Sequence, residues 1–208
     1  MNAAVAEDLQ PCRLAWPRTD TRAGIVPATS AVVAGHSPLP TRVTLADGRV
    51  AYLRAIDRSD CVPLREELFL KLSRESLRNR FFAVKLELTT PELSYLCDVD
   101  FVRHVAIVVS IECGSHRRLV GVARFVRATP TAENAEVAIT VIDHFQGMGI
   151  GKLLLNRLID SARELGVSRF EGIMLTHNRR MANLLRQTRL PLILSREQDT
   201  VSLSMTLR

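Results

Sequence analysis

The sequence predicts a mixed α+β domain over residues 41–208, preceded by a flexible tail over residues 1–40. Three observations support this division. The first 40 residues carry five prolines and no apolar periodicity, so they cannot bury enough surface to offset the entropy of ordering the chain. After them, strand-like apolar runs alternate with amphipathic helical segments. At the centre of this region a strand, a glycine-rich turn and an amphipathic helix follow one another.

The domain begins with a predicted hairpin. The turn dipeptide Asp47-Gly48 stands between two alternating apolar runs, which is typical of a β-hairpin. Residues 57–71 then place apolar side chains at helical spacing among charges. Residues 74–82 form a second amphipathic helical piece that ends in two phenylalanines.

A third helix start is the run Thr89-Thr90-Pro91-Glu92. It combines a hydroxyl cap, a proline in the first turn and a glutamate that can reach back to the cap. We expect this helix to continue to about Cys97.

Three strands and the strongest helix of the sequence are expected next. The run at 104–111 is almost continuously apolar, as a strand covered on both faces would be. A polar turn at 113–117 separates it from strands at 119–126 and 135–142, and a helix at 149–165 follows. The remaining elements are a strand, a short basic helix and two final strands, at 169–175, 178–187, 192–194 and 201–205.

Composition and charge narrow the classes of function. Hydrophobic residues make up 47% of the 208, but no run approaches the roughly 18 apolar residues that span a membrane. The N-terminus has no signal-peptide pattern, so we expect a cytoplasmic protein without membrane contact. The net charge of +6 falls entirely on 41–208, which suits a polyanionic ligand or an acidic partner. Aromatic residues are only 5%, so nucleic-acid binding through base stacking is not expected.

The four cysteines are widely scattered through the sequence. None forms a C-x-x-C pair, and none stands near a histidine at metal-ligand spacing. We therefore expect reduced thiols and no metal site.

The turn QGMGIGK, residues 146–152, carries the chemistry. Three glycines within five positions let the backbone adopt unusual angles and approach a ligand closely. The turn precedes a helix, whose first N–H groups have no internal partner and lie at the positive end of the helix dipole. This arrangement predicts an anion site, and phosphate is its usual ligand.

Two common phosphate loops fail on spacing. A dinucleotide fingerprint needs glycine at 152 or 154, where Lys152 and Leu154 stand. A P-loop needs glycine at 146 and serine or threonine at 153, where Gln146 and Leu153 stand.

The pattern that fits is Q-x-x-G-x-G, which resembles the pyrophosphate-binding signature of the GNAT acetyltransferases. The resemblance covers about residues 41–208, including the order of strands and helices. It implies a central mixed, mostly antiparallel sheet flanked by helices, with acetyl-CoA held where the third and fourth core strands splay apart. The implied acetyl-CoA contacts lie in the strand end, the turn and the last helix: Ile139, Thr140, Val141, Gln146, Gly147, Met148, Gly149, Ile150, Gly151, Lys152 and Asn178. For Asn178, a plain helix cap is an equal alternative.

The chain most resembles the bacterial protein-lysine acetyltransferases, whose domain can be fused to a cyclic-nucleotide domain or an acyl-CoA-synthetase-like region. We expect neither within this sequence, because 40 residues are too few for them. The resemblance implies a protein substrate, possibly a metabolic acyl-CoA synthetase. It rests on LADGRVAYLRAI, LSRESLRNRFF, the Asp-Val-Asp of 98–100 followed by Arg103-His104, Glu136-Val137-Ala138, and His177-Asn178-Arg179-Arg180-Met181.

Acetyl transfer to a lysine requires a base, because an amine with a pKa of about 10.4 is protonated at pH 7. Glu136 interrupts an apolar strand and shares a face with Ala138 and Thr140. The sequence alone leaves an ordinary solvent-facing glutamate open, whereas the resemblance implies that Glu136 is the general base. It also implies direct attack within a ternary complex, without metal or covalent intermediate, and a backbone N–H near Val141 for the oxyanion.

Other functions remain open. Many small-molecule GNAT enzymes carry a tyrosine seven residues after the asparagine, where this chain has Leu185, which weakens the small-amine alternative slightly. A non-catalytic acyl-CoA sensor would bind without turnover, and a nucleic-acid binder would show steep salt dependence. His104 is interpreted as a core or edge histidine. The basic run Arg179, Arg180, Arg186 and Arg189 fits the 3′-phosphate of coenzyme A, an acidic partner or a solvated helix face.

Overall fold

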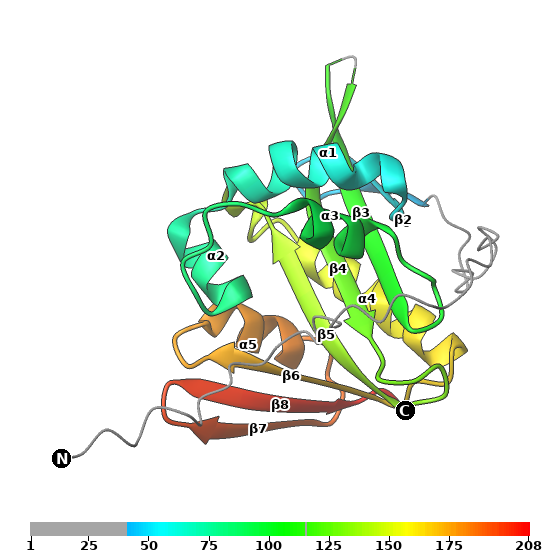
Figure 1. Cartoon of the computed structure of the whole chain (residues 1–208), viewed down its shortest axis with the longest axis vertical. Coiled ribbons are helices and arrows are strands. Elements are labelled where there is room, and N and C mark those ends of the chain that lie inside the picture. The colour runs from blue at the N-terminus through cyan, green and yellow to red at the C-terminus, as the bar shows by residue number, and fades with distance from the viewer. Residues whose placement is uncertain (1–40, 115) are drawn as a thin grey trace.

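A computed structural model describes residues 41–114 and 116–208, so the predicted tail over 1–40 lies outside the described residues. Eight strands form one sheet in the order β1-β2-β3-β4-β5-β6-β8-β7 (Figure 1). All neighbours are antiparallel except β5 and β6, which confirms the predicted mixed, mostly antiparallel sheet. The strands are β1 (Thr41–Thr44), β2 (Val50–Ala55), β3 (His104–Cys113), β4 (His116–Val126), β5 (Asn134–Val141), β6 (Arg169–Leu175), β7 (Leu192–Glu197) and β8 (Thr200–Thr206).

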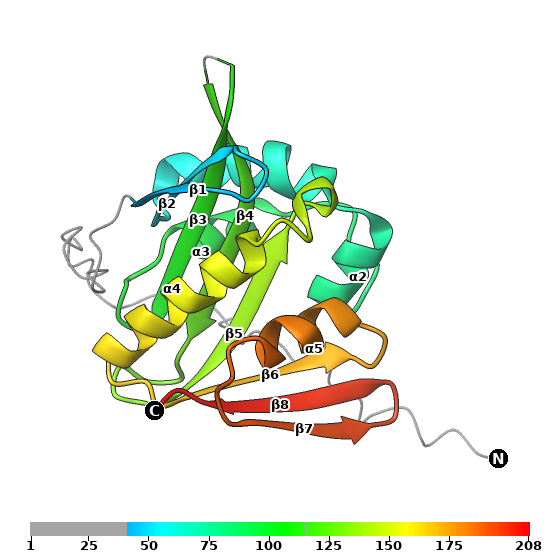
Figure 2. The same ribbon diagram turned by 180° about the vertical axis from the view of Figure 1, so that it is seen from behind.

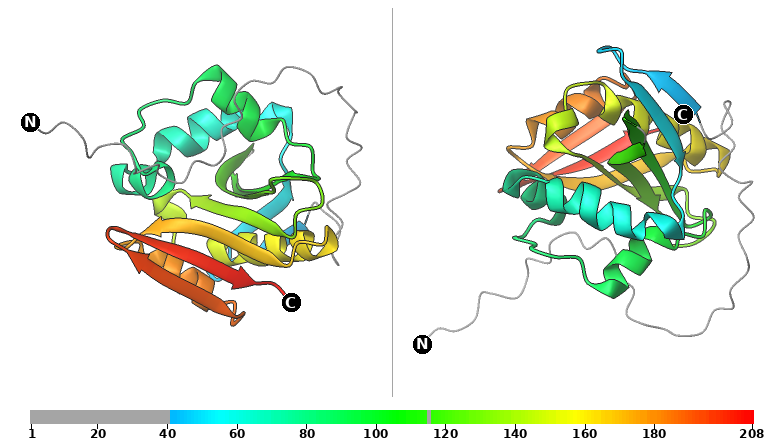
Figure 3. Two further views of the ribbon diagram at one scale, coloured as in Figure 1. Left: turned by 60° about the horizontal axis from the view of Figure 1, so that its bottom comes forward. Right: turned by 90° about the horizontal axis from the view of Figure 1, so that it is seen from above.

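Helices cover both faces of this sheet, as predicted. α4 (Ile150–Glu164) and α5 (Arg179–Arg186) pack on one face (Figure 2). The other face carries α2 (Arg74–Phe81), α3 (Thr90–Cys97) and an irregular helical segment over 58–71. Figure 3 shows the sheet edge-on between these two helical layers. None of the helices in the described ranges is long and apolar enough to cross a membrane.

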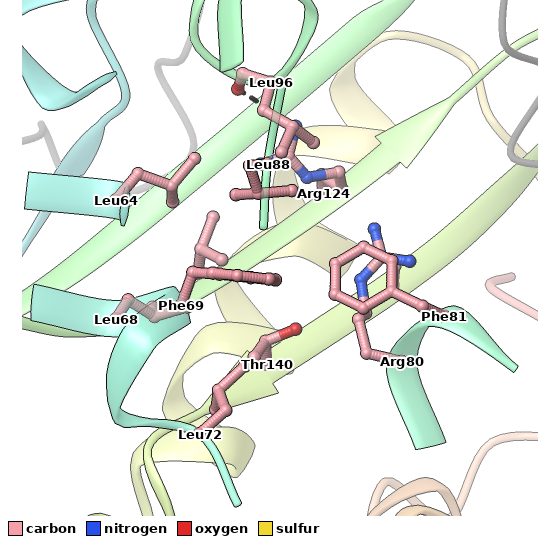
Figure 4. Close-up of a pocket in the computed structure, with 12 residues that line it drawn as sticks. Leu64, Leu68, Phe69, Leu72, Arg80, Phe81, Leu88, Leu96, Arg124 and Thr140 are labelled. Atoms are coloured by element: carbon pink, nitrogen blue, oxygen red, sulfur yellow. Dashed lines mark hydrogen bonds between the residues drawn. The ribbon is translucent and has the colours of Figure 1, made fainter. Parts of the chain in front are cut away.

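The helix predicted over 57–71 is helical throughout but not a regular α-helix. It begins with a capping box between Asp57 and Asp60 and passes through η1 (Arg58–Asp60) and a short α1 (Cys61–Pro63). It then widens into a π-helical stretch, η2 (Leu64–Leu68), and tightens into η3 (Phe69–Lys71). Leu64 and Leu68 of the π stretch and Phe69, which follows it, are all buried in the core (Figure 4). Packing against the sheet therefore outweighs regular helical hydrogen bonding here.

The polar turn predicted over 113–117 is wrong in extent, because β3 and β4 continue pairing to the contact of Cys113 with His116. Side chains from β2 support this extension. The Tyr52 hydroxyl donates to Glu112, and the Arg117 guanidinium lies 3.6 Å from the centre of the Tyr52 ring. The predicted hairpin at Asp47-Gly48 and the Thr89–Glu92 capping box are both confirmed.

The functional part of the sheet is the junction between β5 and β6. These parallel strands pair only at their beginnings, where Asn134, Ala135 and Glu136 lie beside residues 169–171. Beyond Glu136 they diverge, as Figure 1 shows. The third and fourth core strands therefore splay apart as expected, and α4 begins beside the wide end of the gap.

Candidate active site

A cleft of about 460 Å³ opens where β5 and β6 separate. Its walls come from β5, β6, α2, α5 and the glycine turn before α4. This volume lies within the range of roughly 300–1,000 Å³ that is typical of small-molecule sites.

Most of the predicted site residues line this cleft. Two of them do not: the Ile150 side chain is buried in the core, and the Met148 sulfur accepts a 2.8 Å hydrogen bond from Arg49. The predicted residues that line the cleft are Glu136, Ile139, Thr140, Val141, Gln146, Gly147, Gly149, Gly151, Lys152 and Asn178.

Two of the three glycines in the turn have backbone angles that favour glycine. Gly147 and Gly149 have φ of 79° and 86°, a left-handed region that costs other residues about 1–2 kcal/mol. Gly149 is the N-cap of α4, so the first helical N–H groups lie directly beside the cleft. At Gly151 a Cβ atom would stand 3.4 Å from the Leu184 Cδ2 atom, which is an ordinary van der Waals contact, so the packing of α4 against α5 does not itself require glycine here.

Gln146 connects three walls of the cleft. Its amide nitrogen donates to the Val141 carbonyl at 2.9 Å and to the Ser76 hydroxyl at 3.3 Å. Its amide oxygen accepts a 2.6 Å hydrogen bond from Arg180 of α5. Gln146 therefore joins the end of β5 to α2 and α5, which explains why glutamine, with both a donor and an acceptor, suits this position.

Asp143 fixes the beginning of α2 to the same loop. Its carboxylate accepts from the Ser73 N–H at 2.9 Å and from the hydroxyls of Ser73 and Ser76 at 2.7 and 2.8 Å. Burial raises the pKa of Asp143, but these hydrogen bonds outweigh it and hold the pKa below the ordinary value. The carboxylate therefore stays ionised and keeps α2 beside the turn.

Glu136 lies at the narrow end of the cleft, where β5 still pairs with β6. At about 3.3 Å per residue, it is roughly 16 Å along β5 from Val141, which Gln146 contacts. The cleft therefore has a carboxylate at one end and the glycine turn at the other. Its charged lining residues are Glu136 and the three cations Arg80, Lys152 and Arg180.

His104 does not line the cleft, in agreement with its interpretation as a core histidine. It is 7% exposed, and its Nε2 atom lies 3.0 Å from Arg124 Nη1. A guanidinium can only donate, so the imidazole accepts and is neutral. Burial, followed by the charge of Arg124, lowers the pKa of His104 to about 3. Burial together with the charge of Arg80 lowers the pKa of Arg124 to about 9.

The helix-cap interpretation of Asn178 is confirmed, since its side-chain oxygen accepts from the Met181 N–H at 3.1 Å. Its amide nitrogen has no partner among the described residues, so Asn178 can act both as a cap and as a donor to a ligand.

Of the basic run Arg179, Arg180, Arg186 and Arg189, Arg180 lines the cleft. Residues 41–114 and 116–208 contain no cluster of three or more side chains suited to a metal.

Sequence reasoning missed the wall that α2 contributes. Ser76, Asn79, Arg80 and Phe82 line the cleft about 55–60 positions before Glu136, and no local pattern connects them to the turn. The run LSRESLRNRFF contains all four residues, and as one of the runs that carry the family resemblance it could have indicated this wall. Further missed lining residues come from β6 and α5: Ile173, Met174, Met181, Asn183, Leu184 and Gln187.

Comparisons with known proteins agree with this geometry. The model of the acetyltransferase (GNAT) family matches residues 73–188, which is more than half of the chain. Acetyltransferase Pat of Mycolicibacterium smegmatis is 37% identical over 149 residues, covering 72% of this chain and 43% of the relative. Acetyltransferase PA5475 of Pseudomonas aeruginosa is 30% identical over 142 residues, covering 68% of this chain and 75% of the relative.

Solved structures give the same result. The GNAT domain of S. lividans PAT superimposes with a TM-score of 0.72 at 29% identity, covering 80% of this chain and 96% of that one. A cAMP-binding acyltransferase from Mycobacterium smegmatis has a TM-score of 0.57 at 34% identity, covering 81% of this chain and 47% of that one. This chain thus spans less than half of acetyltransferase Pat and less than half of the cAMP-binding acyltransferase. The chain belongs to the GNAT acetyltransferase family.

Proposed function

We propose that this domain transfers acetyl from acetyl-CoA to lysine side chains of proteins, with Glu136 as the general base. The observation that carries the proposal is the arrangement of a single cleft. Glu136 and the Gln146 turn line it at opposite ends of β5, so an acyl donor held by the turn would extend toward the carboxylate.

The binding half of the site is formed by backbone and cations. The N–H groups at the start of α4 suit the pyrophosphate of coenzyme A. Lys152 and Arg180 line the same end and add positive charge. The apolar strand residues Ile139 and Val141 line the cleft beside the pantetheine arm.

The reacting half requires a proton acceptor and a stabilised oxyanion. Glu136 takes the proton from the substrate ammonium, directly or through one water, so that the neutral amine attacks the thioester carbonyl. The carbonyl oxygen becomes negative in the tetrahedral intermediate, and a backbone N–H of β5 stabilises it. Collapse breaks the carbon–sulfur bond, the electron pair leaves on sulfur, and the thiolate takes up the second proton of the nitrogen, so that the amide and free coenzyme A are released. No covalent acyl-enzyme forms.

The charges of the cleft favour one amine over a polyamine. Among the described residues that line it, Glu136 is the acid and Arg80, Lys152 and Arg180 are cations. Lys152 and Arg180 face the donor's phosphates in this proposal, so Glu136 is the one acid of the lining left for a cationic acceptor, and the second ammonium of a polyamine would find no carboxylate there. Position 185 carries a fully buried leucine, so α5 offers no tyrosine there as a general acid. A lysine on a protein, such as an acyl-CoA synthetase, fits these features.

The test uses acetyl-CoA, a lysine-bearing protein mixture, thiol release and mass spectrometry of acetylated lysines. Wild-type protein should release thiol and modify lysines. Glu136→Gln should reduce kcat by about 10²–10⁴-fold while acetyl-CoA binding changes little. Glu171→Gln is a matched control, because Glu171 pairs with Glu136 across β5 and β6 but does not line the cleft. It should retain activity.

Three outcomes would contradict the proposal. Loss of acetyl-CoA binding in Glu136→Gln would mean that Glu136 holds the donor instead of acting as the base. Turnover on free amines without protein acetylation would favour a small-amine enzyme. Tight acetyl-CoA binding without turnover on any amine would favour a sensor.

A further inference from the structure

The side chain of Arg49 joins the β1–β2 hairpin to the glycine turn, 99 positions later in the chain at Met148. In the sheet, β3 and β4 separate this hairpin from β5, yet the hairpin turn lies beside the loop that leads into α4 (Figure 2). The Arg49 Nη2 atom donates to the Met148 sulfur at 2.8 Å, and the guanidinium carbon lies 5.0 Å from the centre of the Phe145 ring. Arg49 therefore connects two segments that the strand order keeps apart.

Met148 is the side chain by which the glycine run can be held. It stands between Gly147 and Gly149, which both have positive φ and carry no side chain of their own. Met148 is half-buried, whereas both glycines are exposed. Glycine loses more backbone freedom on ordering than any other residue. A contact on Met148 therefore restricts the most flexible part of the turn.

Asp47 fixes the Arg49 guanidinium in this position. The Asp47 carboxylate accepts from Arg49 Nε at 2.7 Å, forms an ion pair with Nη2 at 2.5 Å and accepts from the Arg49 backbone N–H at 3.1 Å. The hairpin turn itself is closed by backbone hydrogen bonds, from the Leu45 N–H to the Arg49 carbonyl at 2.7 Å and from the Gly48 N–H to the Leu45 carbonyl at 3.0 Å. The guanidinium is thus held on the hairpin side as well as on the turn side.

The contact of Arg49 complements the anchor that Gln146 provides. Gln146 binds the end of β5, α2 and α5, but it precedes Gly147. The backbone of Gly147 can rotate freely enough to uncouple that anchor from the start of α4. Arg49 holds the next residue, so the two anchors together fix both sides of Gly147.

We propose that Arg49 is a positioning residue for coenzyme A, which orders the Gly147–Gly149 backbone so that the first N–H groups of α4 are in place before the pyrophosphate binds. The inference rests on the proposed function, in which this turn holds the phosphates of acetyl-CoA. Ordering the turn in advance moves its entropy cost from binding to folding, which tightens binding. The coupling is reciprocal, so bound coenzyme A must in turn stabilise the hairpin contact.

The affinity test compares acetyl-CoA with S-acetyl-pantetheine, which carries no phosphate, by calorimetry. In Arg49→Ala the Kd for acetyl-CoA should rise about 5–30-fold, whereas the Kd for S-acetyl-pantetheine should stay within about twofold. Arg42→Ala is the matched control, because Arg42 is exposed on β1 of the same hairpin and its removal changes the net charge equally. It should leave both Kd values unchanged. An equal rise for both ligands in Arg49→Ala would indicate general damage to the cleft and overturn the proposal.

Arg49→Lys separates positioning from charge. Lysine keeps the positive charge but lacks the planar group that contacts Asp47, Phe145 and Met148 together. The variant should therefore bind acetyl-CoA about as weakly as Arg49→Ala. Wild-type affinity in Arg49→Lys would mean that a positive charge near the phosphates is sufficient, and it would refute the positioning role.

Hydrogen exchange provides a readout that does not depend on turnover. In the ligand-free protein, Arg49→Ala should speed amide exchange over residues 146–151. In the wild type, coenzyme A should slow exchange over residues 45–49, and this protection should disappear in Arg49→Ala. Unchanged exchange over 146–151 in the ligand-free variant would contradict the ordering of the turn by Arg49.

Failures of the two proposals give different results. If acetyl-CoA binds the wild type and Arg49→Ala equally well, the positioning role is refuted and the proposed function stands. If acetyl-CoA binds but no amine is acetylated, the proposed function fails, and a higher Kd in Arg49→Ala still supports the role of Arg49. If the wild type binds no acetyl-CoA, both proposals are wrong.

Discussion

Replacing Gly149 by alanine tests the glycine turn separately from overall stability. Gly149 has φ of 86°, and an added Cβ atom would have no heavy atom within 4 Å. The substitution therefore causes backbone strain of about 1–2 kcal/mol and no steric clash within the protein. The alanine also restricts the unfolded chain, which offsets roughly 0.4–1 kcal/mol of that cost. The free energy of unfolding should fall by about 1 kcal/mol.

Gly48→Ala is the matched control for this change. Gly48 has φ of 84° and equally open space around its Cβ position, but it lies in the β1–β2 hairpin. Both variants should therefore lose similar stability in denaturant unfolding. Only Gly149→Ala adds an atom to the cleft lining, so only there should the Kd for acetyl-CoA rise, by at least about tenfold, in calorimetry. Equal Kd values for the two variants would refute phosphate binding at this turn.

Two further changes probe the surroundings of the cleft. Gln146→Ala removes the contacts to Val141 and Arg180 and should raise the Kd for acetyl-CoA about 5–30-fold. The control is Gln187→Ala, because Gln187 also lines the cleft, and it should change this Kd little. Equal effects of the two substitutions would contradict the linking role of Gln146. The pKa of His104 is about 3 in the folded protein and roughly 6.5 in the unfolded chain. Between these two pH values His104 is protonated only in the unfolded chain. The free energy of unfolding therefore falls as the pH decreases below roughly 6.5. Denaturant unfolding from pH 7 to 5 measures how the free energy of unfolding changes with pH, and His104 should contribute at most about 1.4 kcal/mol per pH unit. An unchanged pH dependence in His104→Gln would contradict the assignment of this effect to His104.

Local chemistry explains which elements the sequence could predict. The Asp47-Gly48 turn and the Thr89–Glu92 box work through neighbours in sequence, so their residues alone indicate their structure. The same holds for the turn before α4, where Gly147 and Gly149 adopt positive φ angles that glycine permits. The splay of β5 and β6 was expected only through the family resemblance.

Contacts between distant segments could not be predicted in this way. The π-helical stretch over 64–68 depends on how Leu64 and Leu68 fit the sheet, which helical periodicity does not encode. The side-chain contacts of Tyr52 with β3 and β4 extend the hairpin beyond the expected strand ends. The α2 wall of the cleft depends on Asp143, which binds Ser73 and Ser76 across about 70 positions.

The most direct measurement titrates the protein with acetyl-CoA and with S-acetyl-pantetheine, which has the same reacting group and the same arm but lacks the nucleotide and every phosphate. The N–H groups at the start of α4 should make acetyl-CoA bind with one-to-one stoichiometry and at least about 100-fold more tightly than the phosphate-free thioester. Equal affinity for the two thioesters, or no binding of acetyl-CoA, would contradict the assignment of this turn as the pyrophosphate site.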